Sequence, residues 1–376
     1  MKRIITLTFA VFFAAGITYA QNNTATTTQT GDSNSASVAQ SGSQNQSIVD
    51  QTSGFGTGQT AEVIQSGLQN FSDVLQNQAN AEAYIEQSGD LNSSMTKQSG
   101  YNVLTVFQDG TSNSLSGYGT RARAFQKNGT GVFAADMNVL QLEQMGTSNE
   151  AGVWQEHHGI AEISQVGVGN NSQVYQSGAP GGGMNASTVT IDGDHNTTDT
   201  YQNGEGNSAS ISLQSYDPSN NNVDFDQNGD GNAASFGLQD GSLNDVKVDQ
   251  AGDNNYSEYS VKYGDSNVIT AEVTGNSNRT RLNIVTDWGN MSSGNIINVT
   301  KTGDANYIAG SVEGNGNVLN LMQSGQNNRI GTSWYTGDGV AVSGNSNVIN
   351  VSQMGNGNMS LNTVNGTGNT INVIQN

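Results

Sequence analysis

Few side chains in this sequence have the types and spacing that catalysis or metal binding requires. The pair His157-His158, which follows Glu156, is the cluster that could bind a transition metal. The chain has only 3 histidines and no cysteine, so it offers no ligand spacing typical of a zinc site. Two exposed turn residues explain the pair equally simply, and we prefer that interpretation. Because a Walker loop and a Gly-x-Ser-x-Gly motif are also missing, we expect no enzyme, no catalytic residue, no metal site and no cofactor.

Aspartates that directly follow a glycine form a second group. They recur along the chain at Asp32, Asp90, Asp194, Asp230, Asp253, Asp265 and Asp304. Glycine and aspartate also build the calcium-binding turns of parallel β-rolls, but those have an Asp in each repeat, and most turns here have none. Two other hypotheses stay open: aspartate simply favours turns, or like charges stacked along an edge slow self-association.

The third group is the amides, which belong to a repeat. A Gln is followed two residues later by Gly and then by Asn, as in Gln144-Met-Gly146-Thr-Ser-Asn149, and the next Gln follows at Gln155. We call the Gln of each unit its anchor and select the anchors Gln40, Gln65, Gln87, Gln144, Gln155, Gln323 and Gln353. The turn glycines that we select are Gly42, Gly67, Gly89, Gly146, Gly252, Gly325 and Gly355. The asparagines that we select are Asn45, Asn70, Asn92, Asn149, Asn328 and Asn358. A fixed period of this kind indicates a repeat architecture.

The residues between the turns predict strands. They read Asn-x-Φ-x-Φ-x-Gln, where Φ is apolar, as in Asn317 to Gln323 and Asn347 to Gln353. Alternation at period two places Asn, both apolar residues and Gln on one face of a strand, and glycine supplies the backbone freedom of the turn. A strand of about seven residues cannot bury its face alone, so two strands facing each other form one coil, and the coils must stack.

We therefore expect an all-β, amyloid-like β-solenoid of strand-turn-strand coils, each built from two units of about 11 residues. About fourteen coils would give a rod roughly 70 Å long. Stacking places each Asn and Gln over its equivalent in a neighbouring coil, where the side chains can form hydrogen-bonded ladders. Because unpaired buried amides are costly, these ladders are the predicted assembly site.

Aromatic residues stand immediately before the anchors of alternate units: Phe125, Trp154, Tyr175 and Tyr201. Their parity is opposite to that of the apolar pair, so the rings should point outward. With two strands per coil they would form one exposed column, able to bind flat ligands or glycans or to pack fibres side by side. Scattered surface aromatics are the alternative, because the longer spacing between Gln108 and Gln144 leaves the register of Phe125 open.

Residues 1–20 have the features of a secretory signal peptide. Lys2 and Arg3 precede an apolar run from Ile4 to Gly16, and small residues lead to Gln21. We therefore expect an extracellular protein, which without cysteine must be stable in the absence of disulfides. Acidic residues outnumber basic ones 32 to 12, which argues against a nucleic-acid partner.

The expected domains follow from the repeat. A polar segment spans residues 21–28, and the solenoid spans residues 29–376. Its rhythm breaks near 109–143, 179–190 and 326–341, where we expect loops on the rod. The first of these contains a small basic cluster from Gly117 to Arg123.

The unit resembles the curlin repeat, Ser-x5-Gln-x-Gly-x2-Asn-x-Ala-x3-Gln. Ser35 to Gln51 follows that pattern with Ser47 in the place of Ala, and Gln144 to Gln155 matches it fully. The resemblance covers nearly the whole chain after the leader, although Val or Lys often replaces Gln after Gln214. It implies a secreted subunit of curli-type amyloid fibres that build biofilm matrix and mediate adhesion. It also implies copies of the chain or related curlin-like subunits as partners, a dedicated export machinery, and contact with host or abiotic surfaces.

A second function remains open from a different class. A monomeric secreted β-solenoid adhesin could bind a surface or glycan through one face, and a calcium-stabilised accessory protein is a third possibility. Fibre formation by the purified chain separates the first two, since only a subunit with open ends polymerises.

Overall fold

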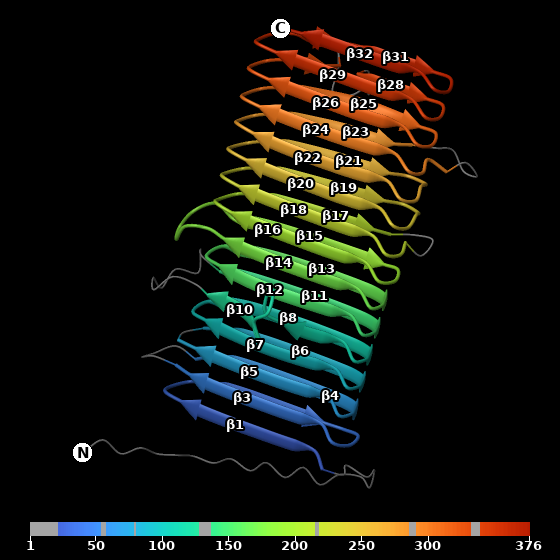
Figure 1. Ribbon diagram of the computed structural model, residues 1–376. Helices are drawn as coiled ribbons and strands as arrows, with labels where there is room; N and C mark the ends of the chain where they lie inside the picture. The colour runs from blue at the N-terminus through green and yellow to red at the C-terminus, as the bar shows by residue number, and fades with distance from the viewer. Residues whose placement is uncertain are drawn as a thin grey trace.

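The computed structural model describes residues 22–53, 58–78, 80–127, 137–214, 218–285, 291–331 and 339–376. These residues form two parallel sheets of 16 strands each, which face one another in a single stack (Figure 1). Over most of the stack, successive strands alternate between the sheets, so two strands and two turns make one coil. The predicted β-solenoid with two strands per coil is confirmed. The signal-peptide prediction for residues 1–20 lies outside the described residues.

The strands are short and similar in length. The first sheet contains β1 Thr24–Thr30, β3 Gln46–Thr52, β5 Phe71–Asn77, β7 Ser93–Ser99, β9 Ser114–Ser116, β10 Ala124–Lys127, β12 Glu150–Glu156, β14 Asn171–Ser177, β16 Thr197–Asn203, β18 Asn222–Asn228, β20 Asp245–Ala251, β22 Val268–Thr274, β24 Ile296–Thr302, β26 Val318–Ser324, β29 Val348–Met354 and β32 Thr370–Gln375. The second sheet contains β2 Ser35–Gln40, β4 Thr60–Leu68, β6 Glu82–Asp90, β8 Asn102–Thr111, β11 Asn138–Thr147, β13 Gly159–Val168, β15 Asn185–Asp192, β17 Ser208–Leu213, β19 Ala233–Leu238, β21 Tyr256–Val261, β23 Arg279–Ile284, β25 Tyr307–Glu313, β27 Arg329–Ile330, β28 Val340–Ser343, β30 Met359–Ser360 and β31 Asn362–Asn365. Among the described residues there is no helix that could cross a membrane.

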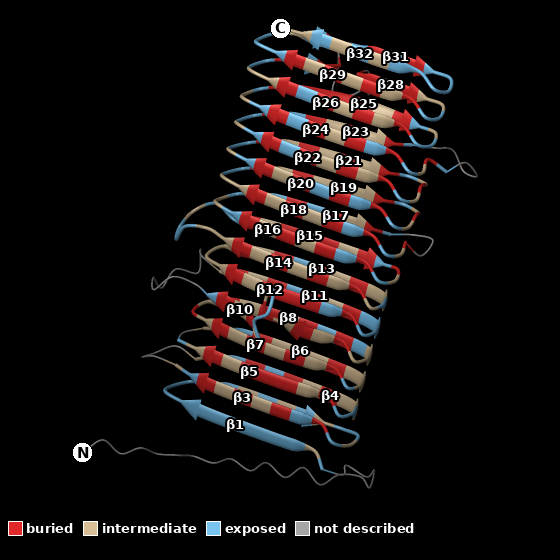
Figure 2. Ribbon diagram, viewed as in Figure 1, coloured by how far each residue is buried: buried red, intermediate tan, exposed pale blue. Residues whose placement is uncertain are grey.

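Side chains alternate between the core and the surface along each strand, as the sequence pattern requires. In β8, Asn102, Leu104, Val106 and Gln108 are buried, while the residues between them face outward (Figure 2). Neighbouring strands are parallel and in register, so equivalent residues lie over one another along the stack. A slip by one residue would turn each inward side chain outward, which is why the buried pattern fixes the register.

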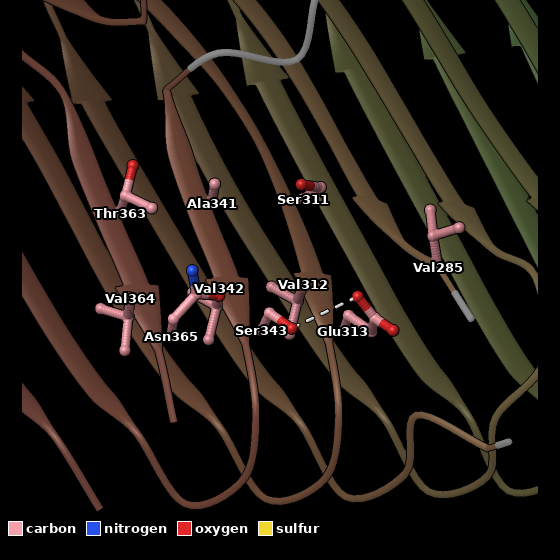
Figure 3. Close-up of a pocket in the computed structure, with 10 residues that line it drawn as sticks. All are labelled: Val285, Ser311, Val312, Glu313, Ala341, Val342, Ser343, Thr363, Val364 and Asn365. Carbon is pink, nitrogen blue, oxygen red and sulfur yellow. Dashed lines mark hydrogen bonds between the residues drawn. The ribbon is translucent and has the colours of Figure 1, made fainter. Parts of the chain in front are cut away.

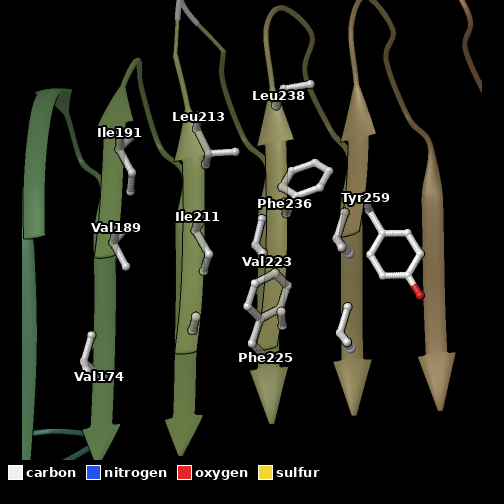
Figure 4. Close-up of a cluster of buried hydrophobic side chains, with 14 of the residues drawn as sticks. Val174, Val189, Ile191, Ile211, Leu213, Val223, Phe225, Phe236, Leu238 and Tyr259 are labelled. Carbon is white, nitrogen blue, oxygen red and sulfur yellow. The ribbon is translucent and has the colours of Figure 1, made fainter. Parts of the chain in front are cut away.

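The apolar core is a continuous strip between the sheets. It is filled mainly by Val, Ile, Leu and Ala. Near the middle of the stack the fully buried rings of Phe225, Phe236 and Tyr259 enter the strip (Figure 4). Full burial of one aliphatic or Phe side chain contributes about 1.5–3 kcal/mol, so the strip stabilises coils that have no disulfide.

The irregular segments differ in extent from the sequence-based limits. In the first, β9 and β10 lie side by side with both β7 and β12, so together they make one rung that residues 117–123 interrupt. The second is shorter than expected, because β15 already begins at Asn185. Much of the third, residues 332–338, lies outside the described part of the chain.

Candidate assembly site

A row of glutamines runs along the inside of the first sheet and is interrupted once, at Val273 and Lys301. Each Nε2 donates to the Oε1 of the next coil, at 2.8 Å from Gln51 to Gln76 and 2.9 Å from Gln155 to Gln176. Nε2 of Gln155 also donates to the carbonyl oxygen of Val139 in the opposite sheet at 3.0 Å. The row consists of Gln29, Gln51, Gln76, Gln98, Gln126, Gln155, Gln176, Gln202, Gln227 and Gln250. It resumes with Gln323, Gln353 and Gln375.

A second glutamine row lies in the second sheet and is shorter. It joins Gln40, Gln65, Gln87, Gln108, Gln144 and Gln165 at 2.7–2.8 Å. After Gln165 the same position holds Ile191, Leu213, Leu238 and Val261. The two sheets therefore differ: in the later coils the second sheet fills the glutamine position with aliphatic side chains.

Asparagines form two further rows at the starts of the strands. Asn45, Asn70, Asn92 and Asn149 belong to the row before the first sheet, and Asn328 and Asn358 belong to the row before the second. Asn244 shows the pattern: its Oδ1 accepts the backbone N–H and Nδ2 of Asn267, both at 3.0 Å, and its Nδ2 donates to the carbonyl oxygen of Gly264 at 2.9 Å. One amide thus joins two coils and closes a turn.

The turn glycines have a second function besides flexibility. All the glycines selected from the sequence have φ between 87° and 114°, a region that favours glycine. In a coil with neighbours on both sides the next turn also lies directly against them: a Cβ on Gly67 would be 2.0 Å from the carbonyl oxygen of Gly89. At Gly355, in an outer coil, the nearest atom would be 3.6 Å away. Close stacking therefore favours glycine in the inner turns, although Pro218 and Ser292 take the equivalent place in two of them.

The turn aspartates occupy two rows, not one. Asp90, Asp194 and Asp265 lie in turns that lead into the first sheet, whereas Asp32, Asp230, Asp253 and Asp304 lie in turns that leave it. All of these side chains except that of Asp32 accept a backbone N–H group of the neighbouring coil, as Asp253 Oδ1 does from Asp230 at 3.0 Å. The neutral Asn276 makes the same bond to Asp253 at 2.8 Å. Of these aspartates only Asp230 and Asp253 lie in adjacent coils, and Glu205 occupies the same row in the coil before Asp230.

Lysine takes the place of glutamine once in the first-sheet row. Lys301 follows Val273 and precedes Gln323 in that row, and its side chain is fully buried. Its ammonium group donates to the backbone carbonyl of Arg279, and burial lowers the Lys301 pKa well below its usual range. The buried Oε1 of Gln323 has no hydrogen-bond partner, so the ladder is broken here.

The Lys301→Gln variant should be more stable at neutral pH by about 1–3 kcal/mol, because it removes a poorly solvated buried group and restores a donor to Gln323. The unfolded chain holds its Lys301 proton up to a pKa of about 10.4, whereas the folded chain releases it at lower pH. The stability of the wild type should therefore rise with pH across that window, and this slope should be smaller in the variant. Guanidinium unfolding at several pH values measures both effects. The exposed Lys247, which pairs with Asp249 at 3.2 Å, provides the control Lys247→Gln, and an equal change of slope there would contradict the assignment.

The outward aromatic residues lie in one column. Phe125, Trp154, Tyr175 and Tyr201 share a register position in β10, β12, β14 and β16. The centroids of Phe125 and Trp154 are 4.3 Å apart, and the rings of Tyr175 and Tyr201 stack at 4.6 Å with their planes 5° apart. All the rings are only half exposed.

Residues 117–123, which we call the strap, fold back over this column. The guanidinium of Arg121 lies 3.8 Å from the ring centroid of Trp154, and the ring of Tyr118 lies 5.5 Å from that of Tyr175. The rings therefore lie in one column, and the strap covers part of it. The basic residues of the strap were visible in the sequence, but its return onto the sheet was not.

Polar contacts fix the strap at both ends. Tyr118 donates to Asp199 at 3.1 Å, and Arg123 forms an ion pair with Asp73. Burial raises the pKa of Asp199 to about 6. These contacts make the strap part of the folded surface.

The histidine pair and one surface pocket are two further features of the described surface. His157 and His158 lie in a turn, and Nδ1 of His158 is 2.8 Å from the carbonyl oxygen of Gly182. Among the described residues, no group of three His, Asp or Glu side chains could hold a metal. A pocket of about 430 Å³ on the second sheet is lined mainly by small or aliphatic side chains, with Ser343 donating to Glu313 at 3.4 Å (Figure 3). The pocket is a shallow depression in the surface of the sheet.

Comparison with known proteins agrees with this geometry. The family model described as Curlin associated repeat matches residues 20–52, which include β1, β2 and β3. No curated protein matches the chain. The strand-turn-strand coil that this segment begins is repeated along the stack to β32. Inward Asn residues recur along it, while the Gln position holds Gln in some coils and aliphatic residues or Lys301 in others. The chain therefore contains a curlin-associated repeat at residues 20–52.

Proposed function

We propose that this protein is a secreted structural subunit of a curli-type amyloid fibre, which assembles end to end and serves biofilm matrix and cell adhesion. The observation that carries the proposal is the in-register stack itself. Inner coils are held to the coil before and the coil after by backbone pairing and by amide bonds, as β14 is held to β12 and β16. Such a stack can accept a further coil of the same kind at either end.

The outermost described strands support this function. In the first sheet, β1 pairs only with β3 and β32 pairs only with β29. All seven residues of β1 are exposed, while the inward residues of inner strands are buried. An exposed strand edge is a template for pairing with another chain. The match of residues 20–52 to the curlin-associated repeat is consistent with an extracellular location and with a non-catalytic role.

Growth kinetics of the purified chain test the proposal. We expect thioflavin-positive fibres by electron microscopy, and we expect the triple variant Gln40→Leu, Gln65→Leu, Gln87→Leu to elongate roughly three- to tenfold more slowly, since a net hydrogen bond contributes about 0.5–1.5 kcal/mol. The strands should persist, because the same row holds Ile191 and Leu213 naturally.

Gln141→Leu is the control, since Gln141 is exposed on the outer face of β11. Equal rates for the triple variant and the wild type would remove the glutamine ladder from the mechanism. A wild type that stays monomeric under all growth conditions would instead favour the monomeric adhesin.

A further inference from the structure

One part of the first sheet has an outer surface without charge. We call it the neutral face: the outward side chains of β24, β26, β29 and β32. Its members are Ile296, Asn298, Thr300, Thr302, Val318, Asn320, Met322, Ser324, Val348, Asn350, Ser352, Met354, Thr370, Asn372 and Ile374. The protein as a whole has a formal net charge of −20, whereas none of these outward side chains is charged.

The neutral face is ordered in columns along the stack. Ile296, Val318 and Val348 share one register position. Beside them runs an outer amide ladder, in which Asn298 donates to Asn320 and Asn320 donates to Asn350, both at 2.8 Å. This ladder joins adjacent coils at the surface and leaves each amide a second N–H to offer outward.

A third column of side chains makes the neutral face uneven. Met322, Ser352 and Ile374 follow one another, and the small Ser352 leaves a groove of about 460 Å³ between its larger neighbours. Met322 is 40% exposed and Ile374 is 73% exposed. Apolar side chains beside a groove form a surface that can interlock with another of similar shape.

The outer face of the same sheet is acidic in the coils closer to the middle of the stack. Asp199, Asp224, Asp226 and Asp249 lie outward on β16, β18 and β20, with Lys247 among them. A second acidic copy is therefore repelled from that part of the sheet and meets no charge on the neutral face. A self-complementary surface of this kind suits a two-fold pair.

We propose that the neutral face is a lateral interface with the neutral face of a second copy of this chain. The two rods run antiparallel and overlap only at the coils of β24 to β32, because a parallel pair would bring the acidic strands β16 to β20 against each other. Asn ladders face each other, and Met322 enters the groove beside the partner's Ser352. This contact pairs rods side by side and does not depend on end-to-end growth.

Sedimentation velocity of the unpolymerised full-length chain tests the pairing. We expect a monomer–dimer equilibrium in the wild type, and at least about tenfold weaker dimerisation for Met322→Glu, because a carboxylate then enters an uncharged contact. Met145→Glu is the matched control: Met145 is 39% exposed on the outer face of the second sheet, and the charge change is identical. Ile296→Glu places the same charge elsewhere on the neutral face and should also weaken the dimer.

Small-angle scattering of the dimer tests the orientation. An antiparallel pair that overlaps only at one end should have a maximum dimension well above that of the monomer, while a parallel pair would keep it almost unchanged. A wild type that remains monomeric at all concentrations, or a dimer weakened equally by Met145→Glu, would overturn the proposal. Loss of fibre growth with the dimer retained would count against the proposed function alone.

Discussion

Replacing Gly89 by alanine should lower the free energy of unfolding by about 3 kcal/mol or more, among the largest effects of any single substitution in the rod. Gly89 has a φ of 94°, and a Cβ there would lie 2.1 Å from the carbonyl oxygen of Gly110 in the next turn. Both the backbone conformation and the spacing between coils oppose a side chain. Guanidinium unfolding followed by circular dichroism measures the loss.

Substitutions at two other glycines separate the effect of backbone strain from that of the close contact between turns. Gly119 has a φ of 66° with no atom within 4 Å of a Cβ, and Gly237 has open space and no positive φ. Gly119→Ala should therefore cost about 1 kcal/mol from backbone strain alone, and Gly237→Ala should be close to neutral. If Gly89→Ala were no more destabilising than Gly119→Ala, the close approach between turns would not contribute to the cost of the Gly89 substitution.

Asn244→Ala should destabilise the protein by about 3–5 kcal/mol. The substitution leaves the backbone N–H and the side chain of Asn267 without their acceptor and removes the donor to Gly264. Each buried group left without a partner costs about 1–3 kcal/mol. Thermal and chemical unfolding measure the change.

Asn298→Ala is the control from the outer ladder. Asn298 is half-buried and makes one side-chain bond, to Asn320, so its removal should cost less than about 1 kcal/mol. Similar losses for the two variants would mean that the inner asparagines do not hold adjacent coils together.

The main features of this fold follow from the sequence because its determinants are local and repeated. The alternation around Leu104 and Val106 and the glycine in most turns define the strand, the turn and the buried face. The Gln-to-Gln spacing then fixes the parallel register, since a slip would expose both the amides and the apolar pair.

Features that depend on contacts between distant residues could not be found in this way. The strap reaches the aromatic column through Arg121 and Tyr118, and no period in the sequence places residues 117–123 over β12 and β14. The two rows of turn aspartates depend on which sheet each turn leaves, which a list of Gly-Asp pairs does not show. Lys301 was visible as a departure from the repeat, but its burial follows only from its place in the glutamine row.

The central claim is that subunits stack end to end as a continuation of the solenoid. Cryo-electron microscopy of fibres grown from the purified chain tests it most directly. We predict filaments in which both parallel sheets continue across the junction, with strands about 4.8 Å apart and the edge of β1 against the opposite end of the next subunit. Fibres whose subunits meet only through their outer faces, with β1 left unpaired, would contradict the account.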